Sequence, residues 1–261
     1  MNIAELKRKS IPQLHDLAES LELPSNGALD RQALIFRIEQ KLLDQEEILV
    51  GEGVLEVLPE GYGFLRSQDW NYLYSPDDIY VSPSQIKRFD LKTGDTVRGQ
   101  VRPPKEWERY LALLKVENVN GGEPEAAKAR IAFDNLRPRY PQGRLRLESS
   151  DGDLSMRVMD LVAPIGKGQR GLIVAPPRTG KTMLLQNMAR GIWANYGPQA
   201  DGSTPPTPSG KPLELCLLLV DERPEEVTDM KRNVPGTVYA SSNDNTLEKH
   251  LELSQLVIER C

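Results

Sequence analysis

The chain opens with apolar residues at helical spacing, in two stretches separated by a break at Pro24–Gly27. Asp30 can cap the second helix. The apolar positions are Ile3, Leu6, Leu14, Leu17 and Leu21, then Leu34, Ile35, Ile38, Leu42 and Leu43. The pattern predicts a small helical domain over residues 1–47.

From Val50 the pattern changes to short runs rich in β-branched and aromatic residues, with Gly, Pro, Asp and Ser between them. The runs are Val50–Leu58, Glu60–Arg66, Asp78–Val81, Thr96–Val101 and Arg109–Val116. Short strands at such intervals predict a small closed barrel of the OB-fold (cold-shock-like) type over residues 48–120. Residues 121–155 are rich in Gly, Pro and charge, and we interpret them as a linker.

Beyond residue 156 apolar runs alternate with helical stretches, which predicts a parallel α/β domain over residues 156–261. The expected strands are Gly171–Val174, Leu213–Val220 and Thr237–Ala240, and the expected helices are Met183–Tyr196 and Leu247–Arg260. Residues 197–212 are of low complexity and indicate a surface loop. The fold class is therefore multidomain: α+β at the N-terminus, α/β at the C-terminus.

Composition adds a local charge asymmetry. The net charge of −5 argues against a uniformly basic nucleic-acid binder, but Lys87–Lys115 holds eight basic and four acidic residues, a net +4. Cys216 and Cys261 suggest no disulfide framework, which fits a reducing cytoplasm. No run approaches the ~18 apolar residues of a membrane helix, so we expect no membrane contact.

The segment Ala175–Thr182 fits the phosphate-binding P-loop pattern, except that Ala175 stands where the pattern begins with Gly. Gly180 lets the backbone approach phosphates, and the N-terminus of the next helix favours their charge. Lys181 would reach the β and γ phosphates, and Thr182 would ligate Mg²⁺. The alternative is a chance strand–turn–helix, but the predicted strand and helix on either side favour the P-loop.

A second apolar strand ends in Asp221-Glu222-Arg223. Asp221 could hold Mg²⁺ through water while Glu222 polarises an attacking water. Equally, both acids could simply favour the start of a helix near Pro224. The residues alone leave the two interpretations open.

Aromatic and charged residues also cluster in the predicted barrel. Tyr62 and Phe64 alternate along one strand and so share a face, on which nucleobases could stack for ~1–3 kcal/mol each. Asp78 could accept a hydrogen bond from the cytosine amino group, and Arg66 could donate to a base or phosphate. Alternatively, the aromatic residues fill the barrel core. Three further aromatic residues look like a partly exposed loop and receive no role: Trp70, Tyr72 and Tyr74.

Five long runs stand in one order along the chain. They are Gly61–Arg66, Asp78–Ile86, Arg102–Lys105, Pro164–Gly171 and Asp221–Thr228. Together they resemble the Rho family of bacterial transcription termination factors over most of residues 1–240. The resemblance implies a RecA-like ATPase domain and a homohexameric ring. Such a ring would capture nascent C-rich single-stranded RNA, translocate along it with ATP and Mg²⁺, and release the transcript from the RNA polymerase complex.

The resemblance also implies residue roles. Glu222 matches the glutamate that activates water, with Lys181 on the phosphates. The implied RNA site comprises Gly61, Tyr62, Gly63, Phe64, Leu65, Arg66, Asp78, Ile79, Tyr80, Glu108, Arg109 and Tyr110. The implied nucleotide site comprises Gly166, Lys167, Gly168, Gln169, Arg170, Gly171, Arg178, Thr179, Gly180, Lys181, Thr182, Met183 and Arg223.

The chain departs from the family in three places, one of which is the 197–212 loop, since it looks like an insertion. The family continues past Cys261 with a second acidic strand, central RNA-contacting loops and an arginine finger. We therefore expect a chain truncated within its ATPase domain and inactive in isolation. Residues 241–249 also match the family poorly. The competing hypothesis is a non-catalytic module that binds single-stranded RNA; a P-loop kinase or GTPase would leave the barrel unexplained.

Overall fold

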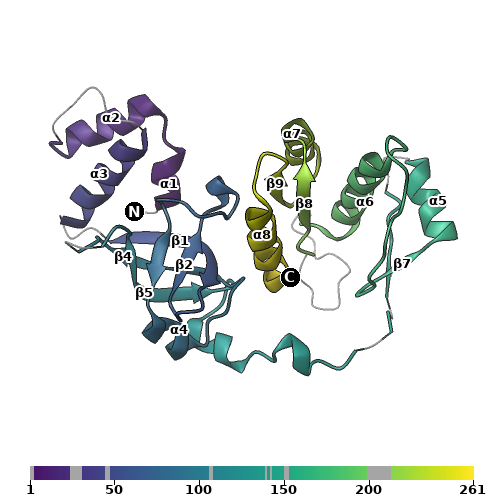
Figure 1. Ribbon diagram of the computed structural model, residues 1–261, viewed down its shortest axis with the longest axis horizontal. Coiled ribbons are helices and arrows are strands. Elements are labelled where there is room, and N and C mark those ends of the chain that lie inside the picture. The colour runs from purple at the N-terminus through teal and green to yellow at the C-terminus, as the bar shows by residue number, and fades with distance from the viewer. Residues whose placement is uncertain are drawn as a thin grey trace. The chain divides into compact units, whose positions relative to one another are not determined.

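The computed structural model describes residues 3–23, 31–44, 48–105, 108–138, 140–141, 143–149, 153–198 and 213–261. They fall into two compact units, one of Met1–Arg130 with Leu251–Cys261 and one of Ile131–His250 (Figure 1). The predicted Asp30 cap and most of the predicted 197–212 loop lie outside the described residues. Each unit is described by itself.

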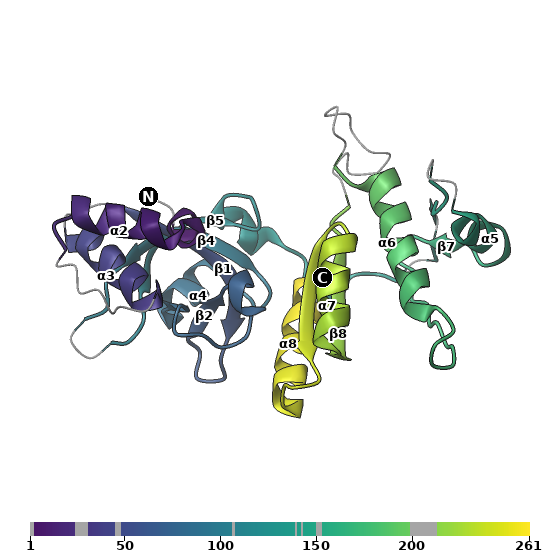
Figure 2. The same cartoon turned by 90° about the horizontal axis from the view of Figure 1, so that it is seen from above.

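The N-terminal residues form three helices that lie together beside the barrel (Figures 1 and 2). At the start of the second helix, the Ser10 backbone N–H donates to Gln13 Oε1 at 2.9 Å, which satisfies a donor that the helix itself leaves unpaired. Leu6, Leu14 and Ile38 are fully buried in the same core as the barrel. The helices are α1 (Ile3–Arg8), α2 (Ile11–Ser20) and α3 (Arg31–Asp44).

The middle of the chain forms a closed barrel in the strand order β1-β2-β3-β5-β4. All neighbouring pairs are antiparallel except β3 and β5, which pair in parallel at Tyr80 and Ala112. The predicted barrel is thus confirmed. Its elements are β1 (Leu49–Val57), β2 (Gly63–Arg66), the 3-10 helix η1 (Gln68–Trp70), β3 (Ile79–Val81), α4 (Pro83–Phe89), β4 (Thr96–Arg102), β5 (Ala112–Val119) and the 3-10 helix η2 (Pro124–Ala129).

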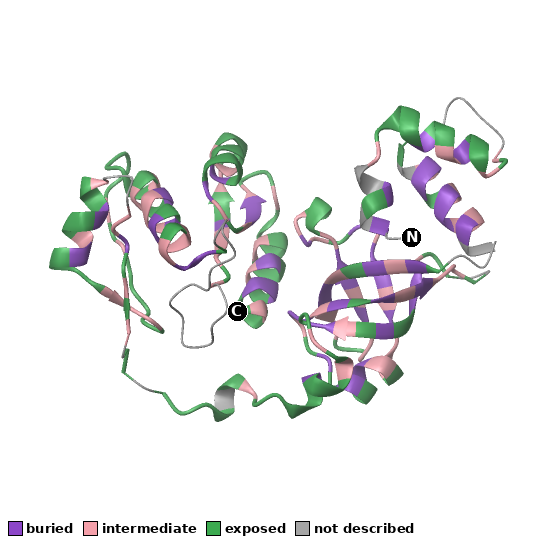
Figure 3. Ribbon diagram, turned by 180° about the vertical axis from the view of Figure 1, so that it is seen from behind, coloured by how far each residue is buried: buried purple, intermediate pink, exposed green. Residues whose placement is uncertain are grey.

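Barrel strands alternate between buried and more exposed positions, as a closed sheet with a packed interior requires (Figure 3). Leu49, Val81 and Val97 are fully buried at its centre. At Gly99 the strands come so close that a Cβ would lie 2.1 Å from the carbonyl oxygen of Lys115. The strand register shifts at the same point, so this position needs glycine.

A buried carboxylate ties the end of η2 to the barrel. Asp95 is 4% exposed and accepts hydrogen bonds from Arg130 Nη2 at 2.9 Å, from the Lys92 backbone N–H at 2.8 Å and from Asn120 Nδ2 at 2.8 Å. Burial raises the pKa of Asp95, but these hydrogen bonds lower it by more, so the net shift is downward. The ionised carboxylate is therefore the form that stabilises this corner.

The second unit contains a small parallel sheet. β8 and β9 pair in parallel, and Leu219, Met230 and Val238 are buried between this sheet and its helices. The predicted parallel pairing of these two strands is confirmed. The elements are the 3-10 helix η3 (Phe133–Asn135), β6 (Arg144–Leu145), α5 (Leu154–Val162), β7 (Ile165–Gly166), α6 (Lys181–Tyr196), β8 (Cys216–Glu222), α7 (Pro224–Asn233) and β9 (Thr237–Ser242); α8 (Leu247–Arg260) follows and continues into the first unit.

The predicted buried strand at Gly171–Val174 is wrong. These residues are all described, yet they form no strand, and Leu172 and Val174 are 87% and 83% exposed. A buried strand needs a neighbour for its backbone groups and a covering layer for its side chains. In the described part of this unit β8 pairs with β9 and β6 pairs with β7. Residues 171–174 therefore have neither a neighbouring strand nor a covering layer there. In the same described residues, no helix is long and apolar enough to span a bilayer.

Candidate RNA-binding face and nucleotide site

Four aromatic rings gather on the barrel. Tyr62 lies 5.8 Å from both Phe64 and Tyr80, measured between ring centroids. Phe64 in turn lies 6.0 Å from Tyr80 and 5.1 Å from Tyr110. We call these four rings the aromatic face.

The barrel positions the aromatic face from three places in the sequence. Tyr62 immediately precedes β2 and Phe64 lies within it, Tyr80 comes from the neighbouring strand β3, and Tyr110 from the segment before β5. The four rings are half-buried, whereas the core consists of aliphatic residues and Phe89. They therefore do not fill the core, and part of each ring is open to solvent.

Arg66 and Asp78 lie beneath this face as a buried ion pair. Their side chains are 7% and 0% exposed, and Arg66 Nε also donates to Glu56 Oε2 at 2.6 Å. Burial lowers the pKa of Arg66, but the carboxylates of Asp78 and Glu56 raise it by more. The guanidinium carbon lies 5.3 Å from the centroid of the Phe64 ring. Contact between this pair and a base requires the pair to open, so the predicted base readout stays a prediction.

Other predicted RNA residues divide between core and rim. Leu65 and Ile79 point into the barrel core and are 2% and 5% exposed, so only their backbone groups could reach a ligand. Glu108 is exposed and receives two hydrogen bonds from Arg102, at 2.6 and 2.9 Å. These bonds lower the pKa of Glu108 to about 2, so it is an anion at neutral pH. Arg109 is exposed beside it.

The basic stretch Lys87–Lys115 is largely available to solvent. Exposed cations can replace the counterions of a nucleic-acid backbone, which makes binding salt-dependent. Its exposed members are Lys87, Arg88, Lys92, Lys105, Arg98, Arg109 and Lys115.

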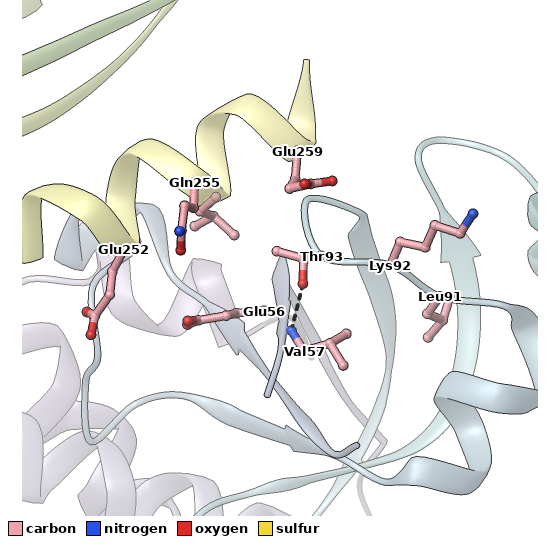
Figure 4. A pocket seen from close by; sticks show the side chains of 9 residues that line it. Glu56, Val57, Leu91, Lys92, Thr93, Glu252, Gln255 and Glu259 are labelled. Atoms are coloured by element: carbon pink, nitrogen blue, oxygen red, sulfur yellow. Dashed lines mark hydrogen bonds between the residues drawn. The ribbon is translucent and has the colours of Figure 1, made fainter. Parts of the chain in front are cut away.

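A separate hollow of about 590 Å³ in the first unit has the opposite character (Figure 4). The Val57 backbone N–H donates to Thr93 Oγ1 at 3.0 Å within it. Three glutamates in its lining disfavour a polyanion such as RNA. The lining residues are Glu56, Val57, Leu91, Lys92, Thr93, Glu252, Gln255, Leu256 and Glu259.

The predicted phosphate loop is an exposed turn that leads into α6. Gly180 has a φ of +89° and precedes Lys181, the first residue of the helix. Thr179 Oγ1 donates to the Pro176 carbonyl at 2.7 Å, which fixes the turn. Lys181 and Met183 at the start of α6 are exposed, so an anion can approach this helix terminus.

Glu222 lies close enough to Lys181 to feel its charge. Burial raises the pKa of Glu222, and Glu226 raises it further, while Lys181 lowers it. Arg223 occupies the N-cap position of α7, so neither Asp221 nor Glu222 is the capping residue. The helix does begin at Pro224, and the alternative that both acids favour its start stays open beside the catalytic one. The predicted phosphate-binding lysine and the predicted catalytic glutamate thus interact electrostatically.

The predicted Gly166–Gly171 segment forms a turn after β7. The Gly166 backbone N–H donates to Gln169 Oε1 at 2.8 Å, and the Lys167 backbone N–H donates to the Gly143 carbonyl at 2.7 Å. Lys167 Nζ lies 5.1 Å from the centroid of the Tyr196 ring. Gln169, Arg170 and Gly171 are exposed.

Sequence reasoning missed Tyr74. Its hydroxyl lies 2.5 Å from that of Tyr110, and this hydrogen bond raises the pKa of Tyr110 to about 12. The prediction that Trp70, Tyr72 and Tyr74 form a partly exposed loop is confirmed, since they are 38%, 9% and 63% exposed. The only indication of Tyr74 in the sequence was that this aromatic residue lies shortly before Asp78, a predicted RNA-binding residue.

Comparison with known proteins identifies both N-terminal segments. A family model described as the Rho termination factor N-terminal domain matches residues 5–47, and one described as the Rho termination factor RNA-binding domain matches residues 51–125. The whole chain is 49% identical to transcription termination factor Rho of Allochromatium vinosum, of which it covers 60%. It is equally 49% identical to the Rho proteins of Pseudomonas aeruginosa and Escherichia coli K12, of which it covers 59%. The chain is thus similar to Rho termination factors over its whole length, and it spans about 60% of the length of the curated relatives that it matches.

Proposed function

We propose that the barrel of this chain binds single-stranded, C-rich RNA on its aromatic face. The observation that carries the proposal is the cluster of four half-open rings on a barrel that matches an RNA-binding domain. Bases of a single strand stack on such rings, and exposed lysines and arginines of the basic stretch contact the phosphates.

In this proposal the chain acts as part of a transcription termination factor. RNA held by the barrel would be passed to an ATPase domain that hydrolyses ATP, moves along the transcript and releases it from RNA polymerase. The supporting fact is the 49% identity to Rho proteins over the whole chain. A homohexameric ring, a RecA-like fold for residues 156–261 and a cytoplasmic location belong to the same proposal.

The donor set around α6 fits a nucleoside triphosphate. We assign Lys181 and the amides of the turn before it to the phosphates, Thr182 to Mg²⁺, and Glu222 to the attacking water. Bound Mg²⁺ would supply charge neutralisation on the phosphates. The raised pKa of Glu222 suits a group that takes a proton near neutral pH.

One observation favours RNA binding without rapid turnover by residues 1–261 alone. The segment Gly171–Val174, which leads into the phosphate loop, is exposed and not paired with another strand in the described part of the unit. A loop that is not held by a sheet is poorly preorganised for the transition state. We therefore propose that this chain by itself hydrolyses ATP slowly.

The RNA-binding proposal is tested by fluorescence anisotropy with labelled C-rich and A-rich oligoribonucleotides at several salt concentrations. We expect tighter binding to the C-rich strand and weaker binding as salt rises. Tyr80→Ala should weaken binding roughly tenfold, since one base stack is lost. Tyr140→Ala, which removes an exposed tyrosine of the second unit, is the matched control. Equal affinity for both strands would refute the cytosine preference.

The nucleotide proposal is tested by ATP binding and hydrolysis in the presence of RNA. We expect wild-type chain to bind ATP, Lys181→Ala to lose that binding, and both to show little hydrolysis. Unchanged ATP affinity in Lys181→Ala would refute the phosphate site. Rapid RNA-stimulated hydrolysis by the wild-type chain would refute the slow-turnover proposal.

A further inference from the structure

A fifth aromatic ring stands beside the aromatic face. Tyr74, in the loop between β2 and β3, is 63% exposed, more than any of the four half-buried rings. A tyrosine with only a packing role would bury its ring, because the ring supplies most of its apolar area. The exposed ring therefore calls for another explanation.

The loop that carries Tyr74 is held by several hydrogen bonds. Trp70 Nε1 donates to Asp77 Oδ2 at 3.2 Å, the Asp77 backbone N–H donates to Ser75 Oγ at 3.0 Å, and the Ser75 backbone N–H donates to Asp78 Oδ2 at 2.9 Å. These bonds flank Tyr74 on both sides in sequence. The backbone that carries the ring is thus ordered before a ligand binds, so binding does not include the entropic cost of ordering this loop.

Tyr74 is joined to the aromatic face by two contacts. Its hydroxyl lies 2.5 Å from the Tyr110 hydroxyl, and the guanidinium carbon of Arg66 lies 5.7 Å from its ring centroid. The same guanidinium lies 5.3 Å from the Phe64 ring. Arg66 thus contacts both rings, and the hydroxyl contact with Tyr110 joins Tyr74 to the aromatic face.

We propose that Tyr74 is an additional base-stacking position, which lengthens the RNA-binding face by one nucleotide beyond the four rings. This inference rests on the proposed binding of single-stranded RNA to the barrel. Stacking suits the site because every base offers a flat surface, while the hydroxyl of Tyr74 is already engaged by Tyr110. Tyr74 should therefore add affinity with little preference for base identity.

The test compares Tyr74→Ala, Tyr74→Phe and the Tyr140→Ala control with a dinucleotide and a longer oligocytidylate. Tyr74→Ala should weaken binding of the longer oligonucleotide about tenfold, because one base stack is lost. It should change the affinity for the dinucleotide by less than about twofold. Tyr74→Phe keeps the ring and should bind both like wild type. Ultraviolet titration should show that Tyr110 ionises at lower pH in Tyr74→Phe, which proves that the hydroxyl contact is lost.

Two results would overturn the inference. One is wild-type affinity of Tyr74→Ala for the longer oligonucleotide. The other is an equal loss in Tyr74→Phe and Tyr74→Ala, which would assign the effect to the hydroxyl bond with Tyr110. If wild-type chain binds neither oligonucleotide, the proposed function itself fails, and this inference fails with it.

Discussion

Replacing Arg66 with alanine should destabilise the barrel far more than the loss of a surface ion pair. The mutation removes the partner of the Asp78 carboxylate, whose side chain is 0% exposed, and also frees Glu56. A buried charge left without its partner costs about 3–5 kcal/mol, whereas an exposed pair contributes at most about 1 kcal/mol. The ion pair of Arg66 and Asp78 is buried, because the Arg66 side chain is only 7% exposed, so the larger cost applies.

Native-state hydrogen exchange of amides in β2 and β3 reports the free energy of unfolding of the barrel itself. We expect Arg66→Ala to lower this free energy by about 3–5 kcal/mol. The matched control is Lys128→Ala, which breaks the exposed pair with Glu125 and should change it by less than about 1 kcal/mol. Similar small effects of both mutations would refute the buried ion pair beneath the aromatic face.

Two further predictions concern the barrel. Gly99→Ala should lower the free energy of unfolding in urea by roughly 1–3 kcal/mol, because the new Cβ meets the Lys115 carbonyl oxygen. The control is Gly122→Ala, which should be nearly neutral because the atom nearest to its new Cβ is 3.7 Å away. Equal destabilisation by both mutations would contradict the close approach at Gly99. Asp95 has a lowered pKa in the folded state, so its stabilisation is present at neutral pH and is lost as the pH falls below about 4. Asp95→Asn should be less stable at neutral pH and lack this acid-dependent loss, and an unchanged acid transition would refute the role of its ion pair with Arg130.

Local patterns in the sequence predicted much of the fold. Short runs such as Thr96–Val101, separated by Gly, Pro, Asp and Ser, predicted the closed barrel, because each run has the length and composition of a strand. The helical spacing from Met183 predicted α6, and the apolar run ending at Val220 predicted β8. These features depend on short-range periodicity, which a sequence displays directly.

Features that depend on distant neighbours could not be read in this way. Gly171–Val174 has the composition of a strand, but a strand forms only where another pairs with it. Arg66 and Asp78 were predicted to contact a base, and only the folded barrel shows that their side chains form a buried ion pair. The proposed role of Tyr74 depends on the fold, which brings Tyr74 against Tyr110, thirty-six residues away in the sequence.

The central claim is that single-stranded RNA lies on the aromatic face of the barrel. Photocrosslinking of a C-rich oligoribonucleotide to the wild-type chain, followed by mass spectrometry of the linked peptides, locates the bound strand directly. The account predicts crosslinks at Tyr62, Phe64, Tyr80 and Tyr110. Crosslinks confined to the second unit, with none on these rings, would contradict it.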